Sequence, residues 1–197
     1  MNTDEITRLS GTRLVPYIQL ATVLIGKSRE AGGNMFRHQL DTMSILIDYN
    51  HIEPVLLKAA IVHDVLEDIP DFNHNIMMTI DHEGHVVYEL VREVTRISGE
   101  TKAEFLTRIR ETGSYNAKLL KVADRISNMI SLGFVNNPEF VGRYTDETER
   151  FIFPMAEEVN CHMLTELSDL VASRRKFLSD IRNIKTEMHK TDSTDFI

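Results

Sequence analysis

Apolar side chains recur every three or four residues along most of this 197-residue chain, which is the spacing of one face of an α-helix. Val87, Leu90, Val91 and Val94, for example, would share one helical face. The sequence has no convincing series of alternating apolar and polar residues, the pattern of half-buried strands. We therefore predict an all-α fold, a helical bundle formed as a single domain over residues 1–190, with its core in about 14–170 and a frayed tail over 191–197.

Proline, glycine and asparagine indicate where the expected helices begin and end. Pro54 is favoured in the first turn of a helix, and the two glycines in residues 30–34 break one. Pro154 predicts a kink or break inside a longer helix. On this basis helices are expected over residues 14–28, 38–49, 53–67, 77–81, 83–96, 102–111, 116–132, 144–170 and 173–187.

The composition argues against several classes of protein. The formal net charge is −8, whereas a general nucleic-acid binder normally carries a basic face. No apolar run approaches the roughly 20 residues that span a bilayer, and the polar start of the chain lacks the pattern of a secretory leader. Cys161 is the only cysteine, so neither an internal disulfide nor a cysteine-rich zinc site can form. These features predict a cytoplasmic protein without a nucleic-acid or membrane partner; they give no oligomeric state.

Four polar, titratable side chains gather at the end of an otherwise apolar helix. His63, Asp64, Glu67 and Asp68 follow the apolar run 59–62, and such a cluster is costly to bury without a metal or partner charges. Helical spacing pairs His63 with Glu67 and Asp64 with Asp68. The alternative is a helix end whose polar side chains are merely solvated, but the apolar run before the cluster and the two acids after it favour a functional cleft.

One helix end cannot complete a metal shell, so further ligands must come from elsewhere in the chain. His38 begins a helix after the glycine-rich break. Asp124 is an acid on a largely apolar helix, with Asn128 one turn later on the same face. Taken alone, Asp124 is equally well explained as an ordinary salt-bridge partner of Lys121 or Arg125.

The order His38, then the pair His63 and Asp64, then Asp124 resembles the H…HD…D ligand order of the HD phosphohydrolase superfamily. Two motifs narrow the resemblance to the hydrolase domain of RelA/SpoT-type enzymes: residues 63–68 resemble its HDxxED motif, and residues 121–129 resemble its KLADRxxNM segment. Residues 91–95 and 147–156 are similar to its VxxVT and ETxxxYxPLA segments. The resemblance covers about residues 14–170.

This resemblance implies an HD-domain helical bundle with a metal-binding cleft. It also implies one divalent metal ion, usually Mn²⁺, held by His38, His63, Asp64 and Asp124. Nitrogen and oxygen donors of this kind suit manganese on chemical grounds as well, although they also accept zinc or iron.

The same resemblance implies the reaction. Glu67 and Asp68 would position and deprotonate the attacking water or protonate the leaving group, and Asn128 would contact the nucleoside or its ribose. The substrate would be a small nucleotide, ppGpp or pppGpp, hydrolysed to GDP or GTP and pyrophosphate. The length of the chain leaves no room for a synthetase domain, so we expect a hydrolase-only enzyme.

Basic residues near these motifs are candidate phosphate ligands. Lys27 and Arg29 precede the glycine-rich break, where the family carries a basic pair. Lys121 lies beside Asp124, and Arg143 falls near a basic position in a later helix of the family. The alternative for each is a solvated surface charge.

Two other functions remain open from the sequence. The family usually has Tyr three residues before the first histidine, where this chain has Met35, and this departure touches the nucleotide pocket rather than the metal site. An HD phosphohydrolase acting on another nucleotide, NADPH included, would keep the same ligand set. A non-catalytic module that senses a nucleotide would need neither the metal ligands nor the acid pair.

Overall fold

The computed structural model describes the backbone of residues 1–192 and the side chains of residues 1–184. Within residues 1–192 the regular structure is helical, which confirms the all-α prediction, and an isolated backbone bridge joins Ser28 to Asn34. The α-helices are α1 (Thr3–Gly11), α2 (Val15–Ala21), α3 (Met35–Asp48), α4 (Pro54–Val62), α5 (Val65–Asp68), α6 (His74–Met78), α7 (Gly84–Val94), α8 (Lys102–Thr112), α9 (Tyr115–Ser131), α10 (Pro138–Glu147), α11 (Phe153–Val159) and α12 (Cys161–Asp192). Two 3₁₀ turns, η1 (Thr22–Leu24) and η2 (Leu132–Phe134), and a π-helical turn, η3 (Thr148–Ile152), complete the order.

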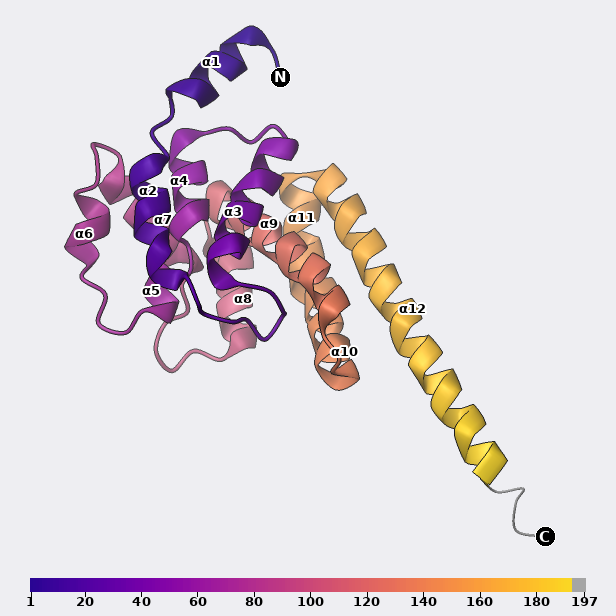
Figure 1. The fold of residues 1–197 in the computed structure, drawn as a ribbon. Helices are drawn as coiled ribbons and strands as arrows, with labels where there is room; N and C mark the ends of the chain where they lie inside the picture. Colours follow the sequence, from indigo (N-terminus) through magenta and orange to yellow (C-terminus); the bar gives the residue numbers. More distant parts are fainter. Residues whose placement is uncertain (193–197) are drawn as a thin grey trace.

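The bundle is organised around α3, α4 and α9 (Figure 1). Helix α3 packs against both α4 and α9, and α9 also contacts α7, α11 and α12. Helix α12 runs along one side of the bundle and its C-terminal half projects beyond it (Figure 1). Helix α1 lies at the opposite end, where Leu9 packs against the core and Glu5 accepts a hydrogen bond from the Asn50 side chain (Figure 1). No helix among the described residues has both the length and the apolar character needed to cross a membrane.

Helix α4 is the most deeply buried element and carries the chain to the HD motif. Residues 56–62 are all buried, and an apolar surface on every side is typical of a helix enclosed by others. Each fully buried leucine, isoleucine or valine side chain contributes about 1.5–3 kcal/mol relative to exposure. The residues of the hydrophobic core come from the part of the chain between Tyr17 and Val171. This packing therefore fixes the end of α4, from which the HD motif begins.

Several expected helix ends in the N-terminal half were wrong because capping and turn residues act locally. The helix expected over 14–28 stops at Leu24, since Ile25 is extended and Gly26 has a φ of 85°. The next helix begins three residues early, because the Asn34 side chain accepts a hydrogen bond from the backbone N–H of Arg37. The helix expected over 77–81 lies at α6 instead, capped by Asn73. The sequence analysis missed α1, which begins at a capping box formed by Asn2 and Glu5.

The long helix expected over 144–170 is also wrong. The break occurs at Asn160, whose extended backbone (φ −164°, ψ 107°) separates α11 from α12. Pro154 sits in the first turn of α11, directly after the π-helical turn, so the hydrogen-bond pattern changes next to this proline but the helical path does not break there. The expected gap between 170 and 173 does not exist, because α12 is continuous through Asp192. Of the expected frayed tail, residues 191 and 192 belong to α12, and residues 193–197 lie outside the described residues.

A buried lysine ties α4 to the loop before α7. Lys58 is 2% exposed, and its Nζ donates to Asp81 Oδ2 at 2.6 Å and to Glu83 Oε2 at 2.5 Å. Burial alone would lower the pKa of Lys58, but these two carboxylates outweigh burial and raise it. Tyr17 donates its hydroxyl to the second oxygen of Asp81 at 2.9 Å, which joins α2 to the same network.

We predict that Lys58→Ala lowers the free energy of unfolding by about 3–5 kcal/mol, because it leaves two carboxylates without their buried partner. The measurement is urea denaturation at neutral pH. The control is Arg92→Ala, which removes an ion pair to Glu89 between side chains 57% and 49% exposed and should change stability by less than about 0.5 kcal/mol. Equal losses in both variants would contradict the prediction.

Candidate metal centre

Three helices bring the predicted ligands together. His38 is the fourth residue of α3, Asp124 lies in the middle of α9, and His63 and Asp64 occupy the short break between α4 and α5. The helix expected to run unbroken to residue 67 is interrupted at this point. The carbonyl of Ala60, one turn before, accepts a hydrogen bond from Nδ1 of His63 at 2.8 Å. This side-chain contact stabilises the turn and aims the other ring nitrogen inward.

Two imidazoles and one carboxylate converge on a small buried space. Nε2 of His38 lies 3.1 Å from Asp124 Oδ1, and Nε2 of His63 lies 3.8 Å from the same oxygen. Donor atoms of His38, His63 and Asp124 all fall within 4.8 Å of one another, and the three residues are 2%, 4% and 5% exposed. The described chain therefore contains a His–His–Asp group that could hold a metal ion.

Hydrogen bonds on the far side of each ring orient the two histidines. Nδ1 of His38 pairs with Ser127 Oγ at 2.8 Å, as Nδ1 of His63 does with the Ala60 carbonyl. Metal-binding histidines characteristically use one nitrogen in this way and leave the other for the ion. Nε2 of His63 is fully buried and has no hydrogen-bond partner among the described residues. Because buried polar atoms are normally paired, this orphaned nitrogen fits a metal ligand.

The charges of the centre are strongly coupled. Burial alone would raise the pKa of Asp124, but the Lys121 ammonium and the two imidazoles lower it well below its usual range. Burial likewise opposes protonation of His63, yet Asp64 and Asp124 raise its pKa to about 8. Lys121 donates to Asp124 Oδ2 at 2.7 Å. The buried carboxylate thus attracts positive charge to this point of the structure.

Asp64 lies at the edge of the same space. Its Oδ2 is 3.3 Å from Nε2 of His63 and 3.6 Å from Nε2 of His38. Its side chain is 23% exposed, whereas that of Asp124 is 7% exposed. The structure thus brings the fourth predicted ligand within reach of both histidines, beside the His–His–Asp group.

The centre opens into a cleft of about 490 Å³. Most of the functional residues predicted from the sequence line this cleft: Arg29, His38, Asp64, Glu67, Asp68, Lys121, Asp124 and Asn128. Asn128 connects two of the others, because it donates to Asp124 Oδ1 and accepts from Nη2 of Arg29, both at 2.5 Å. Arg29, Asn128 and Asp124 therefore form one hydrogen-bonded chain along a wall of the cleft.

The acid pair lies on α5. Asp68 contacts Lys27, whose Nζ donates to the Asp68 backbone carbonyl and lies 3.6 Å from Oδ1. Burial and the nearby Asp64 raise the pKa of Asp68, and Lys27 only partly opposes them. Glu67 is 42% exposed and lies 4.0 Å from Nε of Arg96. The two acids therefore occupy different surroundings: Asp68 is paired with Lys27, whereas Glu67 faces Arg96 at the edge of the cleft.

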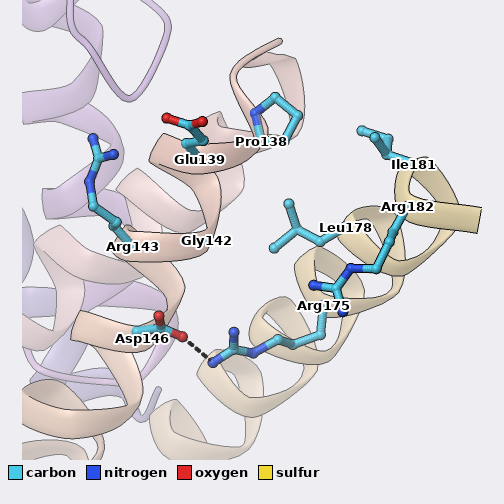
Figure 2. Close-up of a pocket in the computed structure, with 9 residues that line it drawn as sticks. All are labelled: Pro138, Glu139, Gly142, Arg143, Asp146, Arg175, Leu178, Ile181 and Arg182. Carbon is cyan, nitrogen blue, oxygen red and sulfur yellow. Dashed lines mark ion pairs between the residues drawn. The ribbon is translucent and has the colours of Figure 1, made fainter. Parts of the chain in front are cut away.

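Arg143 is not among the cleft residues. It lines a separate groove of about 640 Å³ between α10 and α12, in which Arg175 pairs with Asp146 at 2.6 Å (Figure 2). On α10, however, Arg143 follows Phe140 by three positions and precedes Glu147 by four, and both of these residues line the cleft. Arg143 thus lies at the border between the two surfaces.

Several side chains of the cleft were not predicted from the sequence. Lys102 from α8 and Phe140, Tyr144 and Glu147 from α10 also line it. Desolvation and the positive charges of Lys121 and Arg125 lower the pKa of Lys102 to about 8. Ring centroids of Phe140 and Tyr144 are 5.6 Å apart. Their spacing of four residues was the one available signal, and it is shared with ordinary core positions.

The fold and this centre together define an all-helical protein with a buried His–His–Asp group beneath a charged cleft. No family model matches the chain. The solved structure of a metazoan ortholog of SpoT, which hydrolyses ppGpp and plays a role in starvation responses, has the same fold. Its TM-score is 0.70 at 23% identity, over 82% of this chain and 94% of that one.

Two curated proteins are also similar to this chain in sequence. The bifunctional (p)ppGpp synthase/hydrolase SpoT of Escherichia coli is 28% identical over 177 residues, which is 85% of this chain and 24% of the relative. The probable guanosine-3′,5′-bis(diphosphate) 3′-pyrophosphohydrolase of Mycoplasma genitalium is 29% identical over 124 residues, or 55% of this chain and 17% of the relative. These matches confirm the resemblance to RelA/SpoT-type hydrolases. The chain spans less than a quarter of the length of these curated relatives.

We predict that Mn²⁺ stabilises the folded protein, because an ion that binds only the folded state shifts the unfolding equilibrium. At a free concentration 100-fold above its Kd the gain is about 2.7 kcal/mol. Asp124→Asn should remove this gain, whereas Asp146→Asn, on a side chain 67% exposed, should keep it. Thermal unfolding with and without the ion measures both. A gain that persists in Asp124→Asn would rule this centre out as the binding site.

Proposed function

We propose that this chain is a metal-dependent phosphohydrolase that removes the 3′-diphosphate from ppGpp or pppGpp, giving GDP or GTP and pyrophosphate. The observation that carries the proposal is the convergence of His38, His63 and Asp124 at the base of a cleft that also holds an acid pair. The similarity to curated 3′-pyrophosphohydrolases supports the same reaction.

The donor set fits a divalent ion held by His38, His63, Asp64 and Asp124, and we propose Mn²⁺. A bound ion of this kind lowers the pKa of a water and polarises a phosphoryl oxygen. The protein's own contribution is to fix three of these four side chains: Ser127 orients the His38 ring, the Ala60 carbonyl orients the His63 ring, and Lys121 holds Asp124. Little rearrangement would accompany metal binding.

Glu67 and Asp68 would carry the protons of the reaction. Water attacks the phosphorus attached to the ribose 3′ oxygen, the bond between that oxygen and phosphorus breaks, and the leaving oxygen takes a proton. Asp68 has the raised pKa of a proton donor, and Lys27 holds it in place. Glu67, which lines the same cleft, would then orient the water and accept its proton.

The remaining cleft residues would bind the nucleotide. Arg29 and Asn128 form a hydrogen-bonded pair suited to a ribose hydroxyl or phosphate. Lys121 and Lys102 add positive charge for the diphosphate, and Arg143 would contribute by extending from the border of the cleft. The substrate is a small nucleotide rather than a nucleic acid. We also propose that residues 1–190 act as one domain and that the enzyme works in the cytoplasm, in keeping with its free cysteine, Cys161.

The direct test is release of pyrophosphate from ppGpp by metal-stripped protein, before and after addition of Mn²⁺. We expect release only with the ion. A panel containing GTP and NADPH serves as the control for specificity. Hydrolysis of another nucleotide but not of ppGpp would support a phosphohydrolase and reject ppGpp as its substrate. Mn²⁺ binding without hydrolysis of any nucleotide would favour a nucleotide sensor.

We predict that Glu67→Gln lowers kcat by roughly 10²–10⁴-fold, because a positioned acid or base contributes about that factor. The affinity for Mn²⁺ should not change, since Glu67 is not one of the four proposed ligands and lies outside the His–His–Asp group. Steady-state kinetics and a Mn²⁺ titration measure the two effects separately. Glu89→Gln, an exposed glutamate on α7, is the matched control. Full activity in Glu67→Gln would show that another group carries the proton.

A further inference from the structure

A buried glutamine lies directly behind the metal centre. Gln39 follows His38 on α3 and is 0% exposed. Its Nε2 donates to Asp64 Oδ2 at 2.7 Å, and its Oε1 accepts from the backbone N–H of Asp64 at 3.4 Å. Both ends of the buried amide are thus used on a single residue, which lies in the break between α4 and α5.

Asp64 needs such a partner because of its place in the chain. It follows the end of α4, where backbone N–H and C=O groups lose regular helical partners. The Ala60 carbonyl, the usual acceptor for the N–H of residue 64 in a continuous helix, accepts from the His63 ring. The Asp64 side chain is also 23% exposed, so water competes for its carboxylate. Without Gln39, this carboxylate would be free to turn toward solvent.

We propose that Gln39 is a positioning residue that holds Asp64 as the fourth ligand of the metal ion; this inference rests on the metal site of the proposed function. The hydrogen bond fixes Asp64 Oδ2 at 3.3 Å and 3.6 Å from Nε2 of His63 and of His38. It occupies one lone pair of that oxygen and leaves the remaining carboxylate lone pairs for the ion. Asp64 and Asp124 then approach the two imidazoles from different helices.

The same contact anchors the acid pair. The Asp64 carbonyl accepts from the N–H groups of Glu67 at 3.2 Å and Asp68 at 2.9 Å, which start the single turn of α5. A four-residue helix has little stability of its own. Gln39 hydrogen-bonds both the backbone and the side chain of Asp64. It therefore helps to fix both the metal ligand and the start of the helix that carries the two acids. Its loss should therefore disturb both.

The test compares Mn²⁺ binding by metal-stripped wild type, Gln39→Met and Thr42→Val, with free Mn²⁺ measured by electron paramagnetic resonance. Methionine fills a similar space but cannot donate to Asp64. Because partners of ligating groups are typically worth 10–100-fold in metal affinity, Gln39→Met should weaken binding by that factor. Thr42→Val removes another buried hydrogen bond on α3, to the His38 carbonyl, without touching Asp64, so its affinity should stay at the wild-type value.

A second comparison separates positioning from general damage to the fold. In an Asp64→Ala background, Gln39→Met should change Mn²⁺ affinity by less than about twofold, because the residue through which Gln39 acts is gone. If Gln39→Met does not fold, Gln39→Leu takes its place in both backgrounds. Wild-type affinity in the Gln39 variant, or an equal loss with and without Asp64, would overturn the inference.

These measurements contain no nucleotide, so they are independent of the substrate. Tight Mn²⁺ binding that depends on Gln39 would support the inference even if ppGpp is not hydrolysed. Failure of the wild-type protein to bind a divalent ion would overturn the metal site and this inference together.

Discussion

The site depends on one buried charge, the carboxylate of Asp124. A carboxylate whose side chain is only 7% exposed, on an apolar helix, is stable only if other groups compensate its charge. Lys121 and Asn128 do so from α9 itself, and His38 and His63 approach from two other helices. Because α9 packs against α3, α4, α7, α11 and α12, this compensation is built into the centre of the bundle. The packing that buries Asp124 also places the imidazoles.

The residues that could be predicted from sequence are those whose chemistry conflicts with their surroundings. His63, Asp64 and Asp124 stand beside apolar runs, and polar groups in such positions need a specific partner. Their order along the chain and the resemblance to known motifs then predicted the full set of four metal ligands. Gln39 and Ser127 were not found, because a single neutral polar residue on a helix carries no such conflict. Only the packing of α3 against α4 and α9 shows what these two side chains contact.

Helix ends were harder to predict than helices, and for a physical reason. At Asn160 a single extended residue ends α11, and at His63 a side chain takes the carbonyl of Ala60. At both places a local hydrogen bond from or to a side chain competes with the helical backbone pattern: the His63 ring donates to Ala60, and the Asn160 side chain accepts from the N–H groups of His162 and Met163. The break at His63 has a functional consequence. A continuous helix would have kept the Ala60 carbonyl in its backbone ladder and left the His63 ring without its fixed orientation.

The charge of the cleft would give a bound metal ion a second role in addition to catalysis, that of balancing charge. Six acidic side chains line the cleft and only three basic ones, so the cleft shares the negative balance of the whole chain. A substrate carrying two diphosphates would be repelled by such a surface. A divalent ion at the proposed site would cancel much of this excess, and Arg29, Lys102 and Lys121 would then attract phosphate. An acidic protein can thus bind a highly anionic nucleotide once the metal is in place, without the basic face that a nucleic-acid binder needs.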